Sequence, residues 1–177
     1  MSRLELARSA NLTREETATR AAAVTLDLVE VDLDLRAARD LDIPSFRTRS
    51  TLHFRSTIDE TWVDFLGEGV DEVLVNGAST PVVWDGARVR LTGLAEDNIV
   101  TIAGRGLFST SGEGLHRFRD PVDGEVYLYT QYEPADCRRV YPCFEQPDLK
   151  ARWRFHVTAP LDWTVLSNGA ESSREER

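Results

Sequence analysis

Alternation of apolar and polar residues with a period of two is the feature that most restricts the fold of this chain. The segment VTLDLVEVDLDL, Val24–Leu35, alternates aliphatic and mainly acidic residues, with one phase slip at Leu28–Val29. The segment FRTRSTLHFRS then places Phe46, Leu52 and Phe54 on one face and basic residues on the other. A period of two is typical of strands with one buried face, and a phase slip within a strand indicates a β-bulge.

The same period returns in further short segments along the chain, namely TWVDF, EVLVNGA, PVVWDGARVRL, NIVTIA, EVYLYTQYE, RWRFHV and WTVL. Turn-forming dipeptides lie next to or within several of them: Asn76-Gly77, Asp85-Gly86, Asp123-Gly124 and Asn168-Gly169. Asn-Gly and Asp-Gly between alternating segments are strong hairpin signals. The sequence therefore predicts an all-β domain with a multi-stranded antiparallel arrangement.

One short helix is predicted before the first strand. Thr13 and Glu16 in LTREETATRAAA fit a capping box, in which each side chain binds a backbone amide of the first turn. We expect this helix over residues 13–22.

Length and charge limit the possible classes of protein. A chain of 177 residues suits a single domain, so residues 1–177 are expected to form one β domain. The formal net charge of −9 and the pI near 4.9 disfavour nucleic acid and anionic membrane surfaces as partners. No apolar run has the length of a membrane span or of a signal-peptide core, so the expected location is the cytoplasm.

The cysteines and histidines offer little chemistry by spacing alone. Cys137 and Cys143 are expected to be reduced structural thiols, and a cysteine nucleophile activated by the neighbouring arginines is the less favoured alternative. The three histidines, which are His53, His116 and His156, have no zinc-ligand spacing. We expect no metal site in this chain.

Gln131 and Glu133 form the candidate binding pair. Residues two apart on a strand share a face, so these side chains should stand side by side beyond Tyr127 and Tyr129. A carboxylate in that position can pair with a primary ammonium group, and the amide can donate or accept a hydrogen bond. Ordinary polar side chains at an exposed strand end are the alternative interpretation.

The segment from Gly114 to Gly169 resembles the N-terminal domain of the aminopeptidase N family, the zinc-dependent gluzincin aminopeptidases. The resemblance rests on Thr-Gln-x-Glu, an arginine pair, a Pro-Cys-Phe segment and Pro-Asp-x-Lys within GLHRFRDPVDGEVYLYTQYEPADCRRVYPCFEQPDLKARW. Before Gly114 only the order of short strands agrees. The fold implied is a saddle-like β domain of mixed sheets.

The resemblance implies roles for particular residues. It places Glu133 on the free α-amino group of a peptide and Gln131 along the pocket for the first side chain. Arg138, Arg139 and Glu145 would then support this segment structurally, since arginine forks bonded to carboxylates or carbonyls hold loops in place.

The resemblance also implies what this chain lacks. The family is of the membrane alanyl aminopeptidase type, with zinc held by H-E-x-x-H and a later glutamate in a thermolysin-like catalytic domain, and none of these motifs is present. The chain alone should therefore be inactive in peptide hydrolysis.

Two interpretations of function follow. In the first, the chain is the substrate-anchoring part of a larger aminopeptidase, with peptide N-termini and its own catalytic domain as partners. The polar segment SNGAESSREER has a hairpin signal but no return strand, which suggests that the chain is a fragment. In the second, it is a non-catalytic all-β binding or scaffold module. A fragment would expose a strand edge or an apolar patch, so self-association is also expected.

Overall fold

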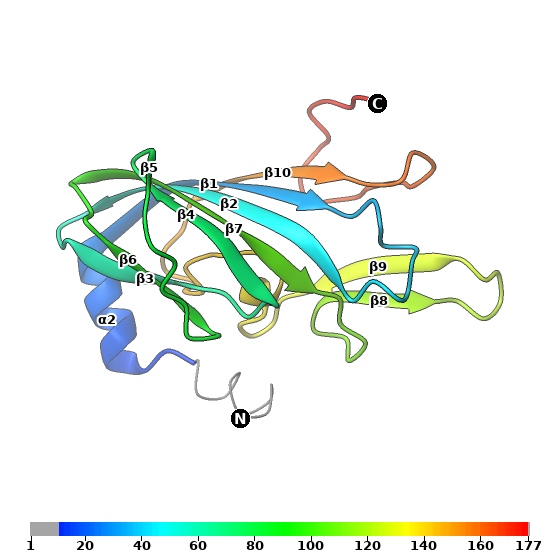
Figure 1. The fold of residues 1–177 in the computed structure, drawn as a ribbon, viewed down its shortest axis with the longest axis horizontal. Helices are drawn as coiled ribbons and strands as arrows, with labels where there is room; N and C mark the ends of the chain where they lie inside the picture. Colours follow the sequence, from blue (N-terminus) through cyan, green and yellow to red (C-terminus); the bar gives the residue numbers. More distant parts are fainter. Residues whose placement is uncertain (1–10, 177) are drawn as a thin grey trace.

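The computed structural model describes residues 11–176, which form mainly β-strands with one helix at their start (Figure 1). Helix α2 spans Arg14–Ala23, and a short 3₁₀ helix, η1, spans Cys137–Arg139. The strands are β1 (Val24–Asp34), β2 (Ser45–Ser56), β3 (Glu60–Asp64), β4 (Gly69–Val75), β5 (Ala78–Ser79), β6 (Arg88–Thr92), β7 (Asp97–Leu107), β8 (Gly114–Arg119), β9 (Val126–Gln131) and β10 (Arg152–Thr158). The predicted all-β class with a short N-terminal helix is confirmed.

The strands form one large mixed sheet and two ribbons. The large sheet has the order β10-β1-β2-β7-β4-β5, and β3–β6 and β8–β9 pair separately. Every pairing in the large sheet is antiparallel except that of β1 with β10, which is parallel. Parallel neighbours need a long connection, and here that connection contains all the other strands of residues 11–176.

The predicted alternation fixes which face of each long strand is buried. On β2, Phe46, Leu52 and Phe54 are buried, whereas the arginines of the same strand are exposed. On β1, the pairing with β2 shifts between Leu26 and Leu28, which is the β-bulge that the phase slip predicted. The sheet therefore has one apolar face over the core and one charged face open to solvent.

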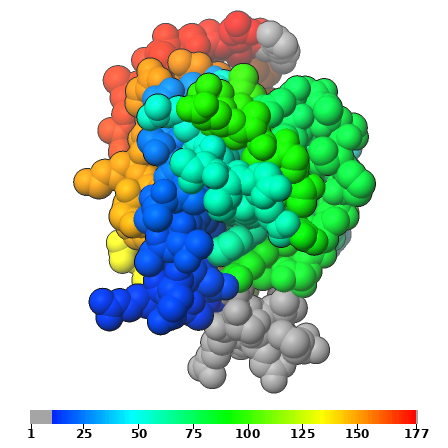
Figure 2. All heavy atoms as spheres, turned by 90° about the vertical axis from the view of Figure 1, so that its left-hand side faces the viewer, coloured from blue at the N-terminus to red at the C-terminus, as the bar shows by residue number. Residues whose placement is uncertain are grey.

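The core lies between the large sheet and the elements that cover its apolar face, namely α2, the β3–β6 ribbon and the loop segments around η1 (Figure 1). Viewed from the helix end, α2, in blue, lies at the surface beside the cyan and green segments of the chain (Figure 2). The fully buried aliphatic and aromatic side chains of the core come from four strands of the large sheet, from both strands of the β3–β6 ribbon and from the loops: Val29, Val31, Leu52, Val63, Phe65, Val73, Val89, Leu91, Val100, Ile102 and Val140.

Helix α2 begins with the predicted capping box. The Thr13 amide donates to Glu16 Oε2 at 2.8 Å, and the Glu16 amide donates to Thr13 Oγ1 at 3.2 Å. Glu16 also accepts two hydrogen bonds from the Arg88 guanidinium, at 2.6 and 3.1 Å. The Glu16 carboxylate thus caps the N-terminus of α2 and also binds strand β6 through Arg88.

Three of the four predicted turn dipeptides adopt turn geometry. Asn76 and Gly77 both have positive φ, 53° and 80°, as a two-residue type I′ hairpin between β4 and β5 requires. Gly86 and Gly124 also have positive φ, in the turns before β6 and between β8 and β9.

The predicted final strand and its turn are wrong. Residues 163–166, the WTVL segment, form no strand, and neither do the residues after Asn168-Gly169 in the described chain. An alternating segment becomes a strand only where a neighbour supplies backbone partners, and no described segment pairs with this one.

The Glu16 carboxyl generates a prediction about pH. The hydrogen bonds from Arg88 lower its pKa from 4.5 to about 2, so its stabilising effect is complete above pH 4.5 and is lost as the pH falls through about 2. Glu16→Gln should lower the free energy of unfolding at pH 7 by about 1 kcal/mol. In urea titrations this difference from the unchanged protein should shrink between pH 4.5 and 2; a constant difference would contradict the assignment.

Candidate functional site

Gln131 and Glu133 lie together at the end of strand β9. The strand ends at Gln131, so Glu133 follows in a turn rather than on the strand as expected. The two residues remain adjacent because the Glu133 amide donates to Gln131 Oε1 at 3.2 Å. The Glu133–Pro134 peptide bond is cis. The pair is therefore held by a turn, and strand alternation alone does not account for it.

The Glu133 carboxylate is open to a ligand. The side chain is exposed, and within residues 11–176 it receives no hydrogen bond and forms no ion pair. On the charged face of the sheet, by contrast, the carboxylates of Asp27, Glu30 and Asp34 are bound to arginine. Glu133 thus retains its acceptor capacity, which suits it to a charge-assisted hydrogen bond from an ammonium group.

An exposed row of aromatic rings precedes the pair on the β8–β9 ribbon. Phe118 stacks on Tyr127 with 5.6 Å between ring centroids, and His116 lies 4.7 Å from Tyr129. Tyr127 and Tyr129 are exposed, as the alternation predicted, while Leu128 is half-buried. The row and the candidate pair therefore form one continuous exposed strip.

Gly114 fixes the register of the ribbon opposite the candidate pair. It pairs with Gln131, has a φ of +64°, and a Cβ on it would lie 2.9 Å from the Cβ of Arg139. Only glycine fits both the left-handed conformation and this close approach. The start of β8, the end of β9 and η1 thus meet at one point.

The loop after Glu133 is held by polar contacts of Arg138 and Glu145. The Arg138 amide donates to Glu145 Oε2 at 2.8 Å. The buried Arg138 guanidinium donates to the Ala135 carbonyl at 2.9 Å and to Asn11 Oδ1 at 2.7 Å. Burial raises the pKa of the Glu145 carboxyl, against the opposing effect of the Arg138 amide. The sequence singled out both residues, and the structure brings them together.

Arg139 binds two acids at the surface side of the same loop. Its Nε donates to Asp136 Oδ1, and Nη2 lies 3.5 Å from Glu113 Oε2. Glu113 directly precedes Gly114 at the start of β8, so Arg139 links η1 to the ribbon.

A buried ion pair beneath this loop had no recognisable signal in the sequence. Arg20 of α2 donates to Asp64 Oδ2 of β3 at 2.9 Å, and both side chains are fully buried. Asp64 Oδ2 also accepts the Glu145 amide at 3.1 Å, and Arg20 Nε donates to Gln146 Oε1 at 2.8 Å. Arg20 and Ala23 are the buried residues of α2, and nothing in the local sequence distinguishes this arginine from an exposed one such as Arg14.

The cysteines pack as structural thiols. Both are free, with Cys143 buried and Cys137 half-buried. Burial raises the pKa of Cys137 to about 11 and that of Cys143 well above its usual range. Since the thiolate is the reactive form, neither is activated as a nucleophile.

No metal site is found within residues 11–176, where no group of three or more potential ligands is placed to hold an ion. His53 lies 3.5 Å from Glu30 on the charged face of the sheet, and His116 Nδ1 accepts the Gly112 amide. These histidines serve surface contacts. The described donors do not fit a zinc ion.

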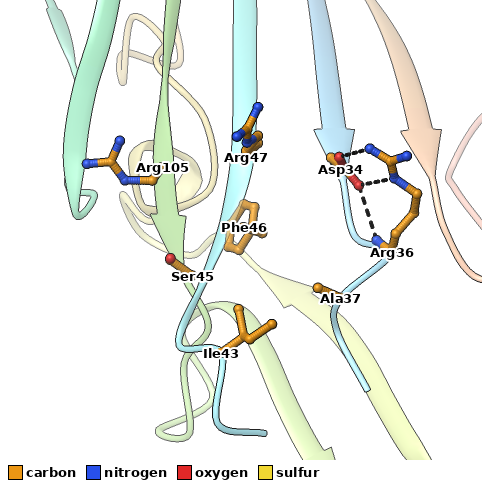
Figure 3. Close-up of a pocket in the computed structure, with 8 residues that line it drawn as sticks. All are labelled: Asp34, Arg36, Ala37, Ile43, Ser45, Phe46, Arg47 and Arg105. Atoms are coloured by element: carbon orange, nitrogen blue, oxygen red, sulfur yellow. Dashed lines mark hydrogen bonds and ion pairs between the residues drawn. The ribbon is translucent and has the colours of Figure 1, made fainter. Parts of the chain in front are cut away.

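A surface cavity of about 550 Å³ lies elsewhere, at the end of the sheet where β1 stops and β2 starts (Figure 3). Arg36 binds Asp34 there, and Arg105 binds Glu68 and Asp71. Its arginines are thus largely neutralised by carboxylates. The residues lining it are Asp34, Arg36, Ala37, Ile43, Ser45, Phe46, Arg47 and Arg105, which do not include the candidate pair.

Comparison with known families decides the relationship. The model of the Peptidase M1 N-terminal domain matches residues 86–177, which is more than half of the chain and includes the whole candidate site. The chain belongs to the Peptidase M1 N-terminal domain family. The resemblance inferred from the sequence is confirmed.

Relatives of this M1 N-terminal domain are much longer proteins. Aminopeptidase N of Streptomyces lividans is 44% identical over 163 residues, which cover 89% of this chain and 19% of that protein. The probable aminopeptidase 2 of Sulfurisphaera tokodaii is 28% identical over 125 residues, covering 70% of this chain and 16% of that protein. The chain thus spans less than a fifth of the length of these two relatives.

Solved structures share the fold. The M1 zinc metallopeptidase of Deinococcus radiodurans superimposes with a TM-score of 0.69 at 20% identity, over 88% of this chain and 37% of that one. The fold of this M1 N-terminal domain is therefore that of part of a larger enzyme. No helix in residues 11–176 combines the length and apolar character needed to cross a bilayer.

The Arg20–Asp64 pair predicts a strongly non-additive pair of substitutions. Asp64→Leu should lower the free energy of unfolding by about 3–5 kcal/mol, because it leaves the Arg20 guanidinium buried without its carboxylate. Adding Arg20→Met should recover part of that loss in urea titrations. The control Glu60→Ala breaks an exposed pair with Arg90 and should cost about 1 kcal/mol or less. A loss for Asp64→Leu as small as the control's would count against the buried pair.

The thiols predict slow alkylation in the folded protein. With the pKa of Cys137 near 11, about one thiol in a thousand is ionised at pH 8, and Cys143 is also inaccessible. Iodoacetamide labelling followed by mass spectrometry should be slow at pH 8 and fast after addition of urea. Rapid labelling of one thiol in the folded state would revive the cysteine-enzyme alternative.

Proposed function

We propose that this chain is the substrate-anchoring N-terminal domain of a zinc metallo-aminopeptidase that removes N-terminal amino acids from peptides. In this proposal Glu133 binds the free α-amino group of the peptide. Residues 1–177 act as one β domain of a larger protein, and the cytoplasmic location expected from the sequence stays a prediction.

The observation that carries the proposal is the state of the Glu133 carboxylate. It is exposed and unpaired within the described residues, and its backbone is tied to Gln131. An enzyme that acts at a chain end must distinguish an ammonium group from an internal amide. A fixed, unneutralised carboxylate does so through a charge-assisted hydrogen bond.

Gln131 is assigned to the wall of the pocket for the first side chain. Its Oε1 accepts one hydrogen bond from the Glu133 amide, so its amide nitrogen and the second lone pair of Oε1 are left to face a substrate. We expect Gln131→Ala to alter the preference among first residues more than the recognition of the amino group.

Arg138, Arg139 and Glu145 are assigned to positioning. Arg138 and Glu145 bind each other through a backbone amide, and Arg139 joins η1 to the start of β8. A binding group must be held within a fraction of an ångström to be effective, and supporting contacts of this kind restrict the backbone that carries it.

The catalytic domain is the proposed partner of the exposed strip on β8 and β9. Half-exposed aromatic rings beside a binding residue are typical of surfaces that become buried in an interface. Because the described residues include no group of three potential zinc ligands placed to hold an ion, the metal and the hydrolytic chemistry are assigned to that domain. The isolated chain should therefore bind without cleaving.

Substitution of Glu133 in the full-length enzyme tests the proposal. Glu133→Ala should lower kcat/KM for aminoacyl nitroanilide substrates by about 30- to 160-fold, which corresponds to about 2–3 kcal/mol of lost amine recognition. The matched control is Glu96→Ala, at an exposed glutamate immediately before β7. Equal kcat/KM values for Glu133→Ala and the unchanged enzyme would refute the assigned role.

A further inference from the structure

Strand β10 forms an open edge of the large sheet. It is first in the strand order, and its one strand partner among the described residues is β1. The C-terminal segment, drawn red, passes on the same side of the molecule (Figure 1) but donates no backbone hydrogen bond to β10 within residues 11–176.

The outward backbone groups of β10 can be assigned from one hydrogen bond. The Leu35 amide donates to the Thr158 carbonyl at 2.7 Å, so Thr158 faces the β1 side. Successive residues of a strand direct their N–H and C=O groups to opposite edges. Trp153, Phe155 and Val157 therefore present unpaired donors and acceptors at the outer edge.

One face of β10 carries aromatic side chains that are only half covered. The Trp153 and Phe155 rings stack at 6.1 Å, and each lies 5.7 Å from the ring of Tyr141. Trp153 is 42% exposed and Phe155 38%, whereas Tyr141 is buried. Apolar surface on the core side of the sheet thus continues outward past β10.

The other face of β10 carries cations. Arg152 binds Asp27 and Arg154 binds Glu30, both through a single nitrogen, and both guanidinium groups are more than half exposed. A guanidinium has five N–H donors, so each of these arginines can donate to a second carboxylate.

The charges of the open face alternate from strand to strand. Strand β2 is basic on this face, with Arg47, Arg49 and Arg55. Strand β1 is acidic, with Asp27, Glu30, Asp32 and Asp34. Strand β10 is basic again, with Arg152 and Arg154. Opposite charges on facing strands stabilise a sheet. The next strand in this series would be acidic.

We propose that the outer edge of β10 is a docking site for an extended polypeptide segment that alternates apolar and acidic residues. The segment adds as a strand: its backbone pairs with Trp153, Phe155 and Val157, its apolar side chains cover the aromatic rings, and its carboxylates bind Arg152 and Arg154. Edge strands accept partners in this way, with main-chain hydrogen bonds for affinity and alternate side chains for specificity.

A second copy of this chain fits the edge less well. Antiparallel pairing of two β10 strands about Phe155 places Arg154 opposite His156, and pairing about Arg154 places two arginines face to face. The first register offers Arg154 no carboxylate, and the second opposes like charges directly, which is destabilising. A second copy of the chain, as in the self-association that the sequence predicts, is therefore the competing occupant of this edge. Its presence is one outcome that the test can show.

The test uses the 177-residue chain and a labelled peptide that repeats Val-Glu-Val-Asp-Leu-Asp. This is the order of residues Val29–Asp34 in β1, the strand with which β10 already pairs. Fluorescence anisotropy should show saturable binding that weakens as salt is added. Arg154→Glu should weaken binding at least about tenfold, whereas Arg119→Glu, an exposed arginine of β8, should leave it unchanged.

Two control peptides separate the contributions. A peptide with lysine in place of every acid, and one N-methylated at alternate residues, should both fail to bind. Circular dichroism checks that each variant remains folded. The proposal is overturned if the acidic peptide does not bind, if Arg154→Glu and Arg119→Glu act alike, if the lysine peptide binds equally well, or if sedimentation shows a dimer that excludes the peptide.

Discussion

The buried ion pair of Arg20 and Asp64 is the constraint on which the rest of this domain depends. It joins helix α2 to strand β3, and through Asp64 it also receives the amide of Glu145 in the loop that follows the candidate site. A charge removed from water is tolerated only when its partner and hydrogen bonds are in place. Three segments distant in sequence must therefore assemble together, and this fixes the loop against the core.

The candidate site combines that fixed base with an exposed tip. Arg138 and Glu145 hold the loop from beneath, while the Glu133 carboxylate at its start has no partner within the described residues. Tyr132, between Gln131 and Glu133, packs edge-on against the buried ring of Tyr141. The contacts that hold this short segment thus belong to other side chains than Glu133, so the backbone is held while the Glu133 carboxylate stays exposed.

Much of the fold could be predicted because local patterns in the chain agree with the final structure. The alternation around Phe46, Leu52 and Phe54 predicted the buried face of β2, and Asn76-Gly77 predicted the hairpin between β4 and β5. The WTVL segment at residues 163–166 has a similar pattern and forms no strand. Alternation reports a preference, and a strand exists only where a neighbour supplies hydrogen-bond partners.

The sequence by itself determined the β class and the helix start at Thr13, because both depend on residues a few positions apart, whereas the turn that holds Glu133 beside Gln131 was seen only in the structure. The parallel pairing of β1 with β10 and the Arg20–Asp64 contact were decided only by the tertiary structure. These contacts join residues separated by 44 positions or more. Their energies depend on burial and on partners that no local pattern specifies.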